Sequence, residues 1–461
     1  MLVALLLTAA ACSNAPRPSE LSAGPGSTAS SVSVGSGPGA TVKGVAGHGD
    51  TNTPARADGA PGNTDNSGSV VTTGGPVEAI PVGRADPSGA APGGIGGPGN
   101  RTGVKKTELR IGVTGYFPGN VLIASDLQKA FNAYADQVNA AGGVHGRRLV
   151  FDIVDTGDVT SEGGVDAAKQ VEGRVLLNCE CQGADNAVGA GAYLDSRGVP
   201  HFQVTATDAI AQQLKHGYVL APTTEGFSLR TLEYMAVPLK LRGKKIGMVR
   251  SNNSVWQPGE AVYKTYSREL GMEVGPIRVT EASQASFVSE MRAMQEAGVE
   301  GIFCFCSLEV LGMVRDGKSL GYEPIIAGPT FSFDIISQAG GGSLDGFRSV
   351  RLGGTVDLAG YAAFRKAVRD RYGSEPLSDG FIFWGYAQFL VEAARLAGPD
   401  PTRARVENAM TTVQSLDTKG AIPPVTYGPN DRIGTTAMLP VRCCNENDRW
   451  ISEGPYAESF R

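Results

Sequence analysis

Positive charge is scarce in this chain compared with what nucleic-acid binding requires. Its 461 residues include 41 Lys and Arg against 46 Asp and Glu, which gives a formal net charge of −5. Domains that bind nucleic acids usually carry a basic excess gathered on one face. The balance of charge therefore argues against a nucleic-acid partner.

Catalytic and metal-binding motifs are also missing. The four histidines are scattered and show no H-E-x-x-H spacing: His48, His145, His201 and His216. The part of the chain after residue 107 shows no pair of carboxylates suited to acid–base catalysis. The sequence thus gives no positive sign of an enzyme, and it predicts neither a cofactor nor a metal site.

One phosphate-binding pattern does occur. Residues 312–319, GMVRDGKS, fit the pattern G-x-x-x-x-G-K-S. A working P-loop needs a strand directly before the pattern and a helix directly after it. Here the pattern begins inside a helical stretch and ends before a strand, so we interpret the match as a coincidence.

A long apolar run is absent from the N-terminus. Residues 1–12, MLVALLLTAAAC, are apolar but too few to cross a bilayer. They resemble the end of a bacterial lipoprotein signal, in which Cys12 would carry the lipid; the alternative is a secretory signal with an incidental cysteine. The sequence predicts an extracytoplasmic protein that is held at the outer face of the bacterial cell membrane by a lipid on Cys12.

Large apolar residues are rare between residues 13 and 106. This segment consists mainly of Gly, Ser, Ala, Pro, Thr and Asn, and it shows no fixed repeat. Such a composition buries too little surface to offset the entropy lost on ordering. We expect a disordered tether between the signal and a folded part.

Cysteine is sparse but its positions are informative. Six cysteines follow Cys12: Cys179, Cys181, Cys304, Cys306, Cys443 and Cys444. An even number in an exported chain favours disulfides, although the sequence cannot select the pairing. We expect each disulfide to lie within one lobe of the folded part, the two lobes being described below. The two Cys-x-Cys pairs, each expected just after a strand, leave a soft-metal site as the alternative.

The folded part alternates between strand and helix patterns. Residues 109–113 are apolar, residues 114–120 form a polar loop, and apolar residues then recur three and four apart until Gly142 and Gly143. Further strands are expected at 149–154, 175–177, 200–204, 245–249, 273–279, 301–305 and 324–326. The order indicates parallel α/β units, whose ligands bind at the carboxyl ends of the strands. Five aromatic residues in the late helix 381–397 are expected to be core: Phe381, Phe383, Trp384, Tyr386 and Phe389.

These features together resemble a known family. The opening strand, loop and helix, the turn GGVHGR at 142–147, the strand at 246–249 and the helix containing WGYA at 384–387 match type I periplasmic binding proteins. The matching members are the substrate-binding components of branched-chain amino acid and amide ABC transporters. The resemblance implies an α/β fold with two Rossmann-like lobes, whose parallel sheets are joined by three crossovers around a central cleft. Lobe one would comprise 107–223 plus 350–431, and lobe two 224–349 plus 432–461.

The same resemblance implies a ligand site between the lobes. Thr205 and Thr207 match positions that hold a ligand carboxylate, and hydroxyls with helix-start N–H groups suit that task. The other positions implied are Asn186 or Gln182 as donors, Tyr116 on the rim, Trp256 as the closing aromatic, and Ser307 and Thr330 in lobe two. Thr330 stands where amino-acid binders often carry an acid, and Ser307 follows Cys306 where an aromatic is expected.

The expected function follows from the resemblance. We expect an extracytoplasmic solute-binding lipoprotein of an ABC importer, which closes its hinge on an amino acid, an amide or a related carboxylate and delivers it to the permease subunits. Two alternatives stay open at this point. The same scaffold could serve as a receptor or sensor without transport, or the paired cysteines could bind a metal.

Overall fold

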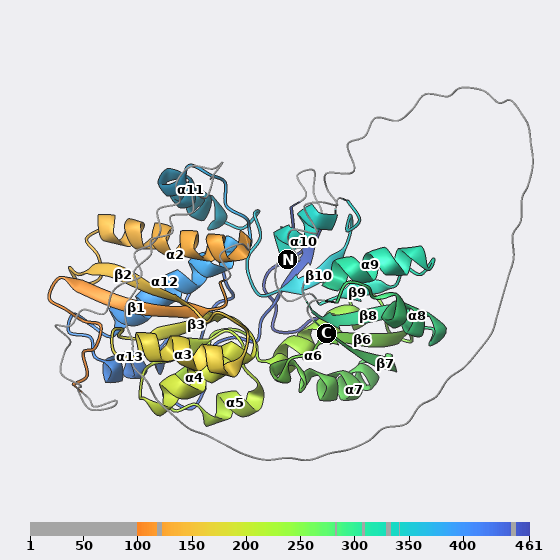
Figure 1. Cartoon of the computed structure of the whole chain (residues 1–461), viewed down its shortest axis with the longest axis horizontal. Helices are drawn as coiled ribbons and strands as arrows, with labels where there is room; N and C mark the ends of the chain where they lie inside the picture. Colours follow the sequence, from red (N-terminus) through yellow and green to blue (C-terminus); the bar gives the residue numbers. More distant parts are fainter. Residues whose placement is uncertain are drawn as a thin grey trace, which may run out of the picture. The chain divides into compact units, whose positions relative to one another are not determined.

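Two parallel β-sheets form the framework of the fold (Figure 1). The first sheet has the strand order β2-β1-β3-β4-β5 and the second has the order β7-β6-β8-β9. The strands of the first are β1 (Glu108–Gly115), β2 (Arg148–Asp155), β3 (Asn178–Gln182), β4 (His201–Gln203) and β5 (Gly217–Val219). Those of the second are β6 (Lys245–Ser251), β7 (Glu273–Thr280), β8 (Gly301–Phe305) and β9 (Ile325–Ala327). Each sheet defines one lobe, as the sequence predicts.

The computed structural model describes residues 99–117, 122–281, 284–306, 309–328, 333–340, 342–443 and 449–461. All of these residues belong to one compact unit of the chain. The predicted signal 1–12 with Cys12, and the predicted tether as far as residue 98, lie outside the described residues. No helix within the described ranges is both long enough and apolar enough to cross a membrane.

Residues 99–106, which the sequence assigns to the tether, contact the folded unit. The Asn100 carbonyl accepts a hydrogen bond of 3.0 Å from the Arg403 N–H, and Arg101 pairs with Asp400. Asn100 itself is buried. The ordered chain therefore begins before residue 107, because local polar contacts can fix a segment that has few large apolar residues.

Helices cover both faces of the first sheet. They are α2 (Leu122–Ala140), α3 (Ser161–Val171), α4 (Asp185–Ser196), α5 (Asp208–Gln213), α11 (Tyr361–Tyr372), α12 (Gly380–Leu396) and α13 (Arg403–Met410). Helix α2 packs against α11 and α12, while α3 and α4 pack against each other. The strand order reverses between β1 and β3, which is where open α/β sheets form a ligand crevice.

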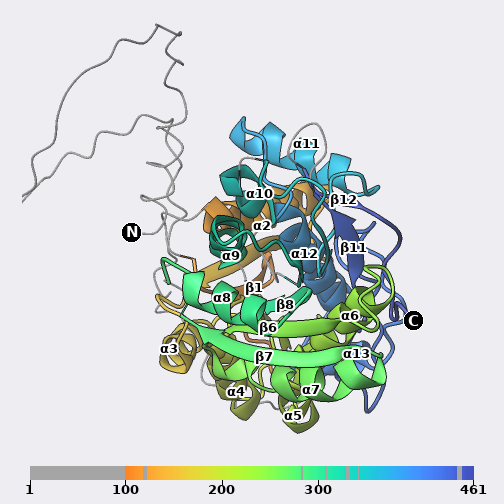
Figure 2. The same ribbon diagram turned by 90° about the vertical axis from the view of Figure 1, so that its right-hand side faces the viewer.

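The second sheet is flanked by helices and by a small antiparallel sheet (Figure 2). The helices are α6 (Thr224–Ala236), η1 (Ser254–Trp256), α7 (Gly259–Glu269), α8 (Val288–Glu296), α9 (Glu309–Ser319) and α10 (Phe333–Gly340). The small sheet joins β10 (Arg348–Arg351), β11 (Leu439–Arg442) and β12 (Ile451–Ser452). The P-loop-like residues 312–319 lie inside α9, which confirms that the pattern is a coincidence.

The chain crosses between the lobes after β5, after β10 and before β11. Strand β10 pairs with β11 and packs against β9 and α6, so its contacts are with the second lobe. The limit expected at 349/350 falls inside β10. We propose that this lobe limit follows residue 351, with the other limits as expected from the sequence.

Helix α12 forms the centre of the largest core. The five aromatic residues predicted as core are all buried there. The Trp384 ring packs edge-on against Tyr134 of α2, with 4.9 Å between ring centroids, and Phe389 packs against Phe202 of β4 at 5.0 Å. These contacts hold α12 between α2 and the first sheet.

The turn after α2 has the predicted form. Gly142 and Gly143 take positive φ angles of 96° and 76°, which end the helix without strain only in glycine. A Cβ on Gly143 would lie 2.0 Å from the Arg147 carbonyl oxygen. The His145 ring nitrogen Nε2 lies 2.9 Å from the Arg395 carbonyl oxygen, so this histidine ties the turn to α12.

The prediction for the third strand is wrong by three residues. The apolar run 175–177 precedes β3, which instead comprises Asn178–Gln182. Asn178 and Glu180 are fully buried although their side chains are polar. Residues 178–182 were predicted as a loop because polar residues alternate with cysteine there. In the structure, Asn178 and Glu180 instead belong to a buried polar cluster on one face of the strand.

Candidate ligand-binding site

The loop after β4 runs along the edge of the first sheet that faces the second lobe. The Val204 N–H donates to the Glu180 carbonyl at 3.4 Å and extends the contact between β4 and β3. Thr205 and Ala206 are buried, at 2% and 1% exposure. Within the described part of the chain, neither of their backbone N–H groups has a hydrogen-bond acceptor. Buried N–H groups are nearly always paired, so these two are candidates for binding an anion.

The two predicted threonines of this loop have different positions. The Thr205 hydroxyl lines a cavity and donates a 2.9 Å hydrogen bond to the Gly183 carbonyl. Thr207 is the N-cap of α5, where its hydroxyl oxygen accepts from the Ile210 N–H at 3.2 Å. Thr207 does not belong to the residues that line the cavity.

The crossover from β5 to α6 forms a second side of the cavity. Thr223 caps α6 by accepting from the Gly226 N–H at 3.1 Å, and its hydroxyl donates to Asp208 at 2.6 Å. The Thr224 hydroxyl donates to the Val255 carbonyl at 2.8 Å. The crossover is thus fixed to both lobes next to the loop that carries Ala206.

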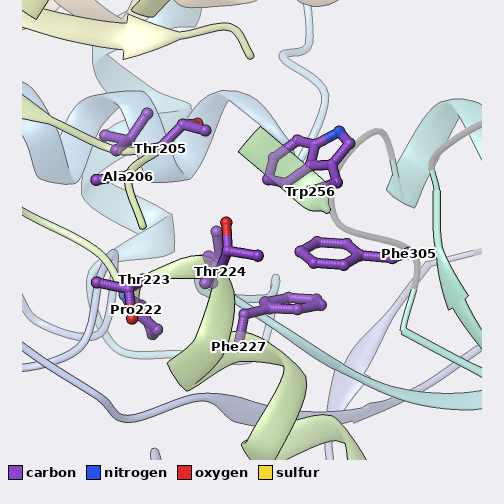
Figure 3. Close-up of a pocket in the computed structure, with 10 residues that line it drawn as sticks. Thr205, Ala206, Pro222, Thr223, Thr224, Phe227, Trp256 and Phe305 are labelled. Atoms are coloured by element: carbon purple, nitrogen blue, oxygen red, sulfur yellow. The ribbon is translucent and has the colours of Figure 1, made fainter. Parts of the chain in front are cut away.

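An aromatic wall from the second lobe closes the cavity (Figure 3). Phe305, at the end of β8, stacks on Phe227 of α6 with 5.1 Å between ring centroids and an interplanar angle of 13°. The Trp256 ring on η1 lies 4.7 Å from Phe305. Figure 3 shows these three rings facing the loop that carries Thr205 and Ala206.

The cavity between these groups is small. It encloses about 20 Å³, which is room for little more than one water molecule. Its lining residues are Val204, Thr205, Ala206, Pro222, Thr223, Thr224, Phe227, Trp256, Phe305 and Leu352. Among these described residues, none has a charged side chain. The wall is apolar and aromatic, and its polar groups are hydroxyls and backbone amides.

Three further predicted residues, Asn186, Gln182 and Tyr116, do not line the cavity. Asn186 is buried with its amide used inside the first lobe, where Oδ1 accepts from the Ala184 N–H at 2.7 Å and Nδ2 donates to Thr156 at 3.0 Å. Gln182 and Tyr116 lie side by side at the β1/β3 edge, joined by a 3.4 Å backbone bond. Ser307 and Thr330 lie outside the described residues.

Several residues that line the cavity were not predicted from the sequence: Phe227, Phe305, the crossover 222–224 and Leu352. Phe305 ends a predicted strand, and that position could have marked it. Phe227 lies three residues inside α6, where a lone aromatic looks like ordinary core. Leu352 follows β10, whose place in the fold the sequence left open.

The cysteine pairs lie in the cores of the lobes and are oxidised. Cys179 is bonded to Cys181 within β3, and Cys304 is bonded to Cys306 at the end of β8. Cys443 is also disulfide-bonded. The prediction of pairs within one lobe is confirmed for the two Cys-x-Cys pairs, but Cys179 and Cys181 lie inside their strand and not after it. The metal-binding alternative loses the four thiolates on which it depended.

A buried charged cluster lies on the face of the first sheet that packs against α4. We call Asn178, Glu180, Asp195 and His201 the histidine cluster. The His201 Nδ1 atom lies 2.9 Å from Glu180 Oε2, and its Nε2 atom lies 3.5 Å from Asp195 Oδ1. Asn178 Nδ2 donates to Glu180 Oε1 at 2.7 Å.

The cluster shifts the pKa values of its members. Burial alone would lower the pKa of His201, but the negative charge of Glu180, the hydrogen bond to Glu180 and the charge of Asp195 raise it to about 9. Burial alone would raise the pKa of Asp195, but the His201 ring 3.5 Å away and the hydrogen bond from the His216 N–H lower it to about 2. His201 is therefore a buried cation held by two anions.

Comparison with protein families identifies the fold. A family described as periplasmic binding protein matches residues 108–448. The chain belongs to the periplasmic binding protein family. The description of the family gives a binding role, which agrees with the function expected from the sequence.

Solved periplasmic binding proteins share the fold at low sequence identity. A fatty acid ABC transporter substrate-binding protein from Thermomonospora curvata is 19% identical, with a TM-score of 0.70, and the match covers 78% of this chain and 95% of that one. A branched-chain amino acid ABC transporter from Thermus thermophilus with bound valine is 14% identical, with a TM-score of 0.67 and coverage of 77% and 98%. An ABC transporter solute-binding protein from R. palustris in complex with benzoate is 14% identical, with a TM-score of 0.63 and coverage of 76% and 97%. A search of curated proteins gave no match.

Proposed function

We propose that this protein is the solute-binding component of an ABC importer and that its ligand is a small carboxylic acid with an aromatic or aliphatic body. The observation that carries the proposal is the pair of buried N–H groups of Thr205 and Ala206 opposite an aromatic wall. Two amide donors can bind a carboxylate without a charged side chain. The rings of Phe305, Phe227 and Trp256 would bury the apolar body.

The wall chemistry disfavours an α-amino acid. An α-ammonium group needs a carboxylate or several acceptors, because burying an unpaired charge is costly. Within the described lining, no side chain offers a negative charge. The structural relatives include one named for fatty acids and one in complex with benzoate, and both ligands have the chemistry that this wall favours.

Binding would proceed by closure of the two lobes. The two rings leave room for little more than one water in this structure, so the second lobe has to move away to admit the ligand. The carboxylate docks on the loop after β4, and the second lobe then brings Trp256 and Phe305 back over the ligand, farther from the loop than they lie here. The permease would recognise the closed form, whose population the ligand raises. A lipid on Cys12 would keep the protein at the membrane while it delivers its ligand.

A thermal-shift screen with calorimetry tests the ligand class. Benzoate and octanoate are expected to raise the melting temperature, because a ligand that binds only the folded state stabilises it. Benzamide, which has the same ring without the charge, and valine serve as the comparison ligands. The proposal is wrong if valine stabilises the protein and the carboxylates do not, or if benzamide binds as tightly as benzoate.

A conservative variant tests the aromatic wall. Phe305→Leu keeps an apolar side chain but removes the ring that stacks on Phe227. We therefore expect the affinity for benzoate to fall more than the affinity for octanoate. Phe347→Leu is the control, since Phe347 contacts Trp450 and does not line the cavity. Equal losses for both variants would place the ligand elsewhere.

A further inference from the structure

A direct set of hydrogen bonds joins the two lobes beside the cavity. Asp185 begins α4, which follows the carboxyl end of β3, and Ser254 begins η1, which follows the carboxyl end of β6. Asp185 Oδ1 accepts a hydrogen bond of 2.8 Å from the Ser254 hydroxyl and one of 3.2 Å from the Val255 N–H. Its second oxygen accepts from the Ser254 N–H at 3.4 Å.

The turn held in this way carries the closing aromatic. Val255 is buried, and its carbonyl accepts a 2.8 Å hydrogen bond from the Thr224 hydroxyl while its N–H donates to Asp185. Trp256 is the next residue, and its ring lies 4.7 Å from the Phe305 ring over the cavity. The backbone of Val255 is therefore fixed on both sides immediately before the residue that covers the site.

The Asp185 side chain could either stabilise its own helix α4 or bind the other lobe, and its direction distinguishes these two roles. An acidic residue in the first turn of a helix commonly stabilises that helix through its own N–H groups. Here the bonds recorded for both carboxylate oxygens come from η1 of the other lobe. Because α4 belongs to the first lobe and η1 to the second, a movement of the two lobes apart at this edge would break these bonds.

We propose that Asp185 is a closure latch: its carboxylate binds the Ser254–Val255 turn of the second lobe, positions Trp256 over the cavity and slows ligand release without contacting the ligand. The inference rests on the proposed solute-binding function. It assigns to Asp185 a positioning role that the resemblance to the family did not imply.

Intrinsic fluorescence reports the latch with the full chain and without a ligand. Trp384 and Trp450 are buried, whereas Trp256 is only half-buried, so acrylamide quenching reports mainly on Trp256. We expect Asp185→Asn to raise the quenching constant about twofold, because charge-assisted hydrogen bonds are the stronger ones. Ser254→Ala removes the hydroxyl donor from the opposite lobe without altering α4 and leaves the two backbone donors, so its effect should have the same direction and be smaller.

Two controls separate the latch from general destabilisation. Asp166→Asn removes the same charge from the neighbouring helix α3, where the side chain is 61% exposed and pairs with Lys169. We expect this variant to match the wild type in quenching. The effect of the double variant Asp185→Asn, Ser254→Ala should be smaller than the sum of the two single effects, because both changes weaken the same contact.

Benzoate supplies the kinetic readout. We expect Asp185→Asn to raise the dissociation rate about three- to tenfold in stopped-flow measurements while the association rate stays unchanged. The latch is disproved if Asp185→Asn leaves both the quenching constant and the dissociation rate at wild-type values. If benzoate binds no variant at all, the proposed ligand class fails, and the quenching comparison still decides whether the latch exists.

Discussion

Strands β3 and β8 occupy equivalent places in the two lobes but differ in chemistry. Each lies between two parallel neighbours. Strand β3 contains both cysteines of its Cys-x-Cys disulfide, whereas β8 contains Cys304 and ends just before Cys306. Strand β8 reads GIFCF and is apolar on both faces, which is typical of a buried parallel strand. Strand β3 reads NCECQ and presents its polar residues to the histidine cluster.

The difference shows that a buried parallel strand can carry a charged residue when that residue is paired, as Glu180 is with Asn178 and His201. In β8, Phe303 and Phe305 stack with 5.8 Å between their centroids, and stability comes from apolar burial. In β3, Glu180 holds the buried His201 and is held by Asn178. Losing one partner of such a pair leaves an unpaired buried charge, which costs more than a change of apolar shape.

Removing Glu180 gives the largest expected effect. Glu180→Leu leaves the His201 cation with Asp195 alone, so we expect a loss of about 3–5 kcal/mol in the free energy of unfolding. Phe303→Leu in β8 is the control and should cost only about 1–2 kcal/mol. Urea denaturation followed by circular dichroism measures both, and equal losses would remove the distinction between the strands.

Alkaline pH should lower the stability of the first lobe, because His201 loses its charge. The pKa of His201 is raised from 6.5 to about 9, so its charge stabilises the fold fully below pH 6.5, and this stability is lost as the pH rises through about 9. The shift corresponds to about 3 kcal/mol. The lowered pKa of Asp195 acts in the opposite sense, since its contribution is lost as the pH falls from 3.8 through about 2.

The measurement is the urea midpoint between pH 6 and pH 10. Wild-type protein should lose stability across this range, while His201→Gln should start lower and show a flatter profile. A wild-type profile as flat as that of the variant would show that His201 is neutral in the folded protein.

Two glycines offer a finer comparison of the lobes. A Cβ on Gly217 would lie 2.4 Å from the His201 ring, whereas a Cβ on Gly247 in β6 would lie 2.3 Å from the Met294 sulfur. The imidazole is fixed by its ion pairs, but methionine can change rotamer. We expect Gly217→Ala to cost about 1–3 kcal/mol and Gly247→Ala less than about 1 kcal/mol. Thermal denaturation of both variants would show the order, and the reverse order would contradict a fixed imidazole.

Removing the disulfide of one lobe or of the other should give the smallest difference in stability loss. Replacing Cys179 and Cys181 by serine, or Cys304 and Cys306 in a second variant, opens a very short loop in each case. Closing such a short loop removes little entropy from the unfolded chain. Each variant should therefore lose only about 1–2 kcal/mol in the free energy of unfolding, and the two losses should be similar. Melting temperatures under oxidising conditions provide the check. A much larger loss in one lobe would mean that its disulfide has a role beyond loop closure.

The sequence predicted the fold because its apolar patterns and glycines act locally. Strand β8 was predicted at its actual bounds, and Gly142 and Gly143 end α2 as expected. The polar strand β3 was misplaced because alternation of Asn178 and Glu180 with cysteine looks like a loop until the partner His201 is found. That partner is 21 residues from Glu180 in the sequence, and no local signal connects them.

The candidate site was predicted only in part for a related reason. Thr205 and Trp256 were named and do line the cavity, since both follow strand ends. Thr207 and Asn186 were named for their chemistry, yet their side chains cap a helix and join two loops. Phe227 contacts Phe305 from a distant part of the chain, and Asp185 contacts η1 of the other lobe; a local sequence pattern cannot reveal either contact.

The backbone donors of the loop after β4 also bear on how this protein could evolve. Substitution at Thr205 or Ala206 changes the side chain but leaves the N–H group in place, provided that the new residue is not proline. The part of the site that would hold a carboxylate is therefore insensitive to most point mutations. If the proposed carboxylate site is correct, new ligand preferences would arise at Phe227, Trp256 and Phe305, and descendants of this protein would differ in the body of the acid that they accept.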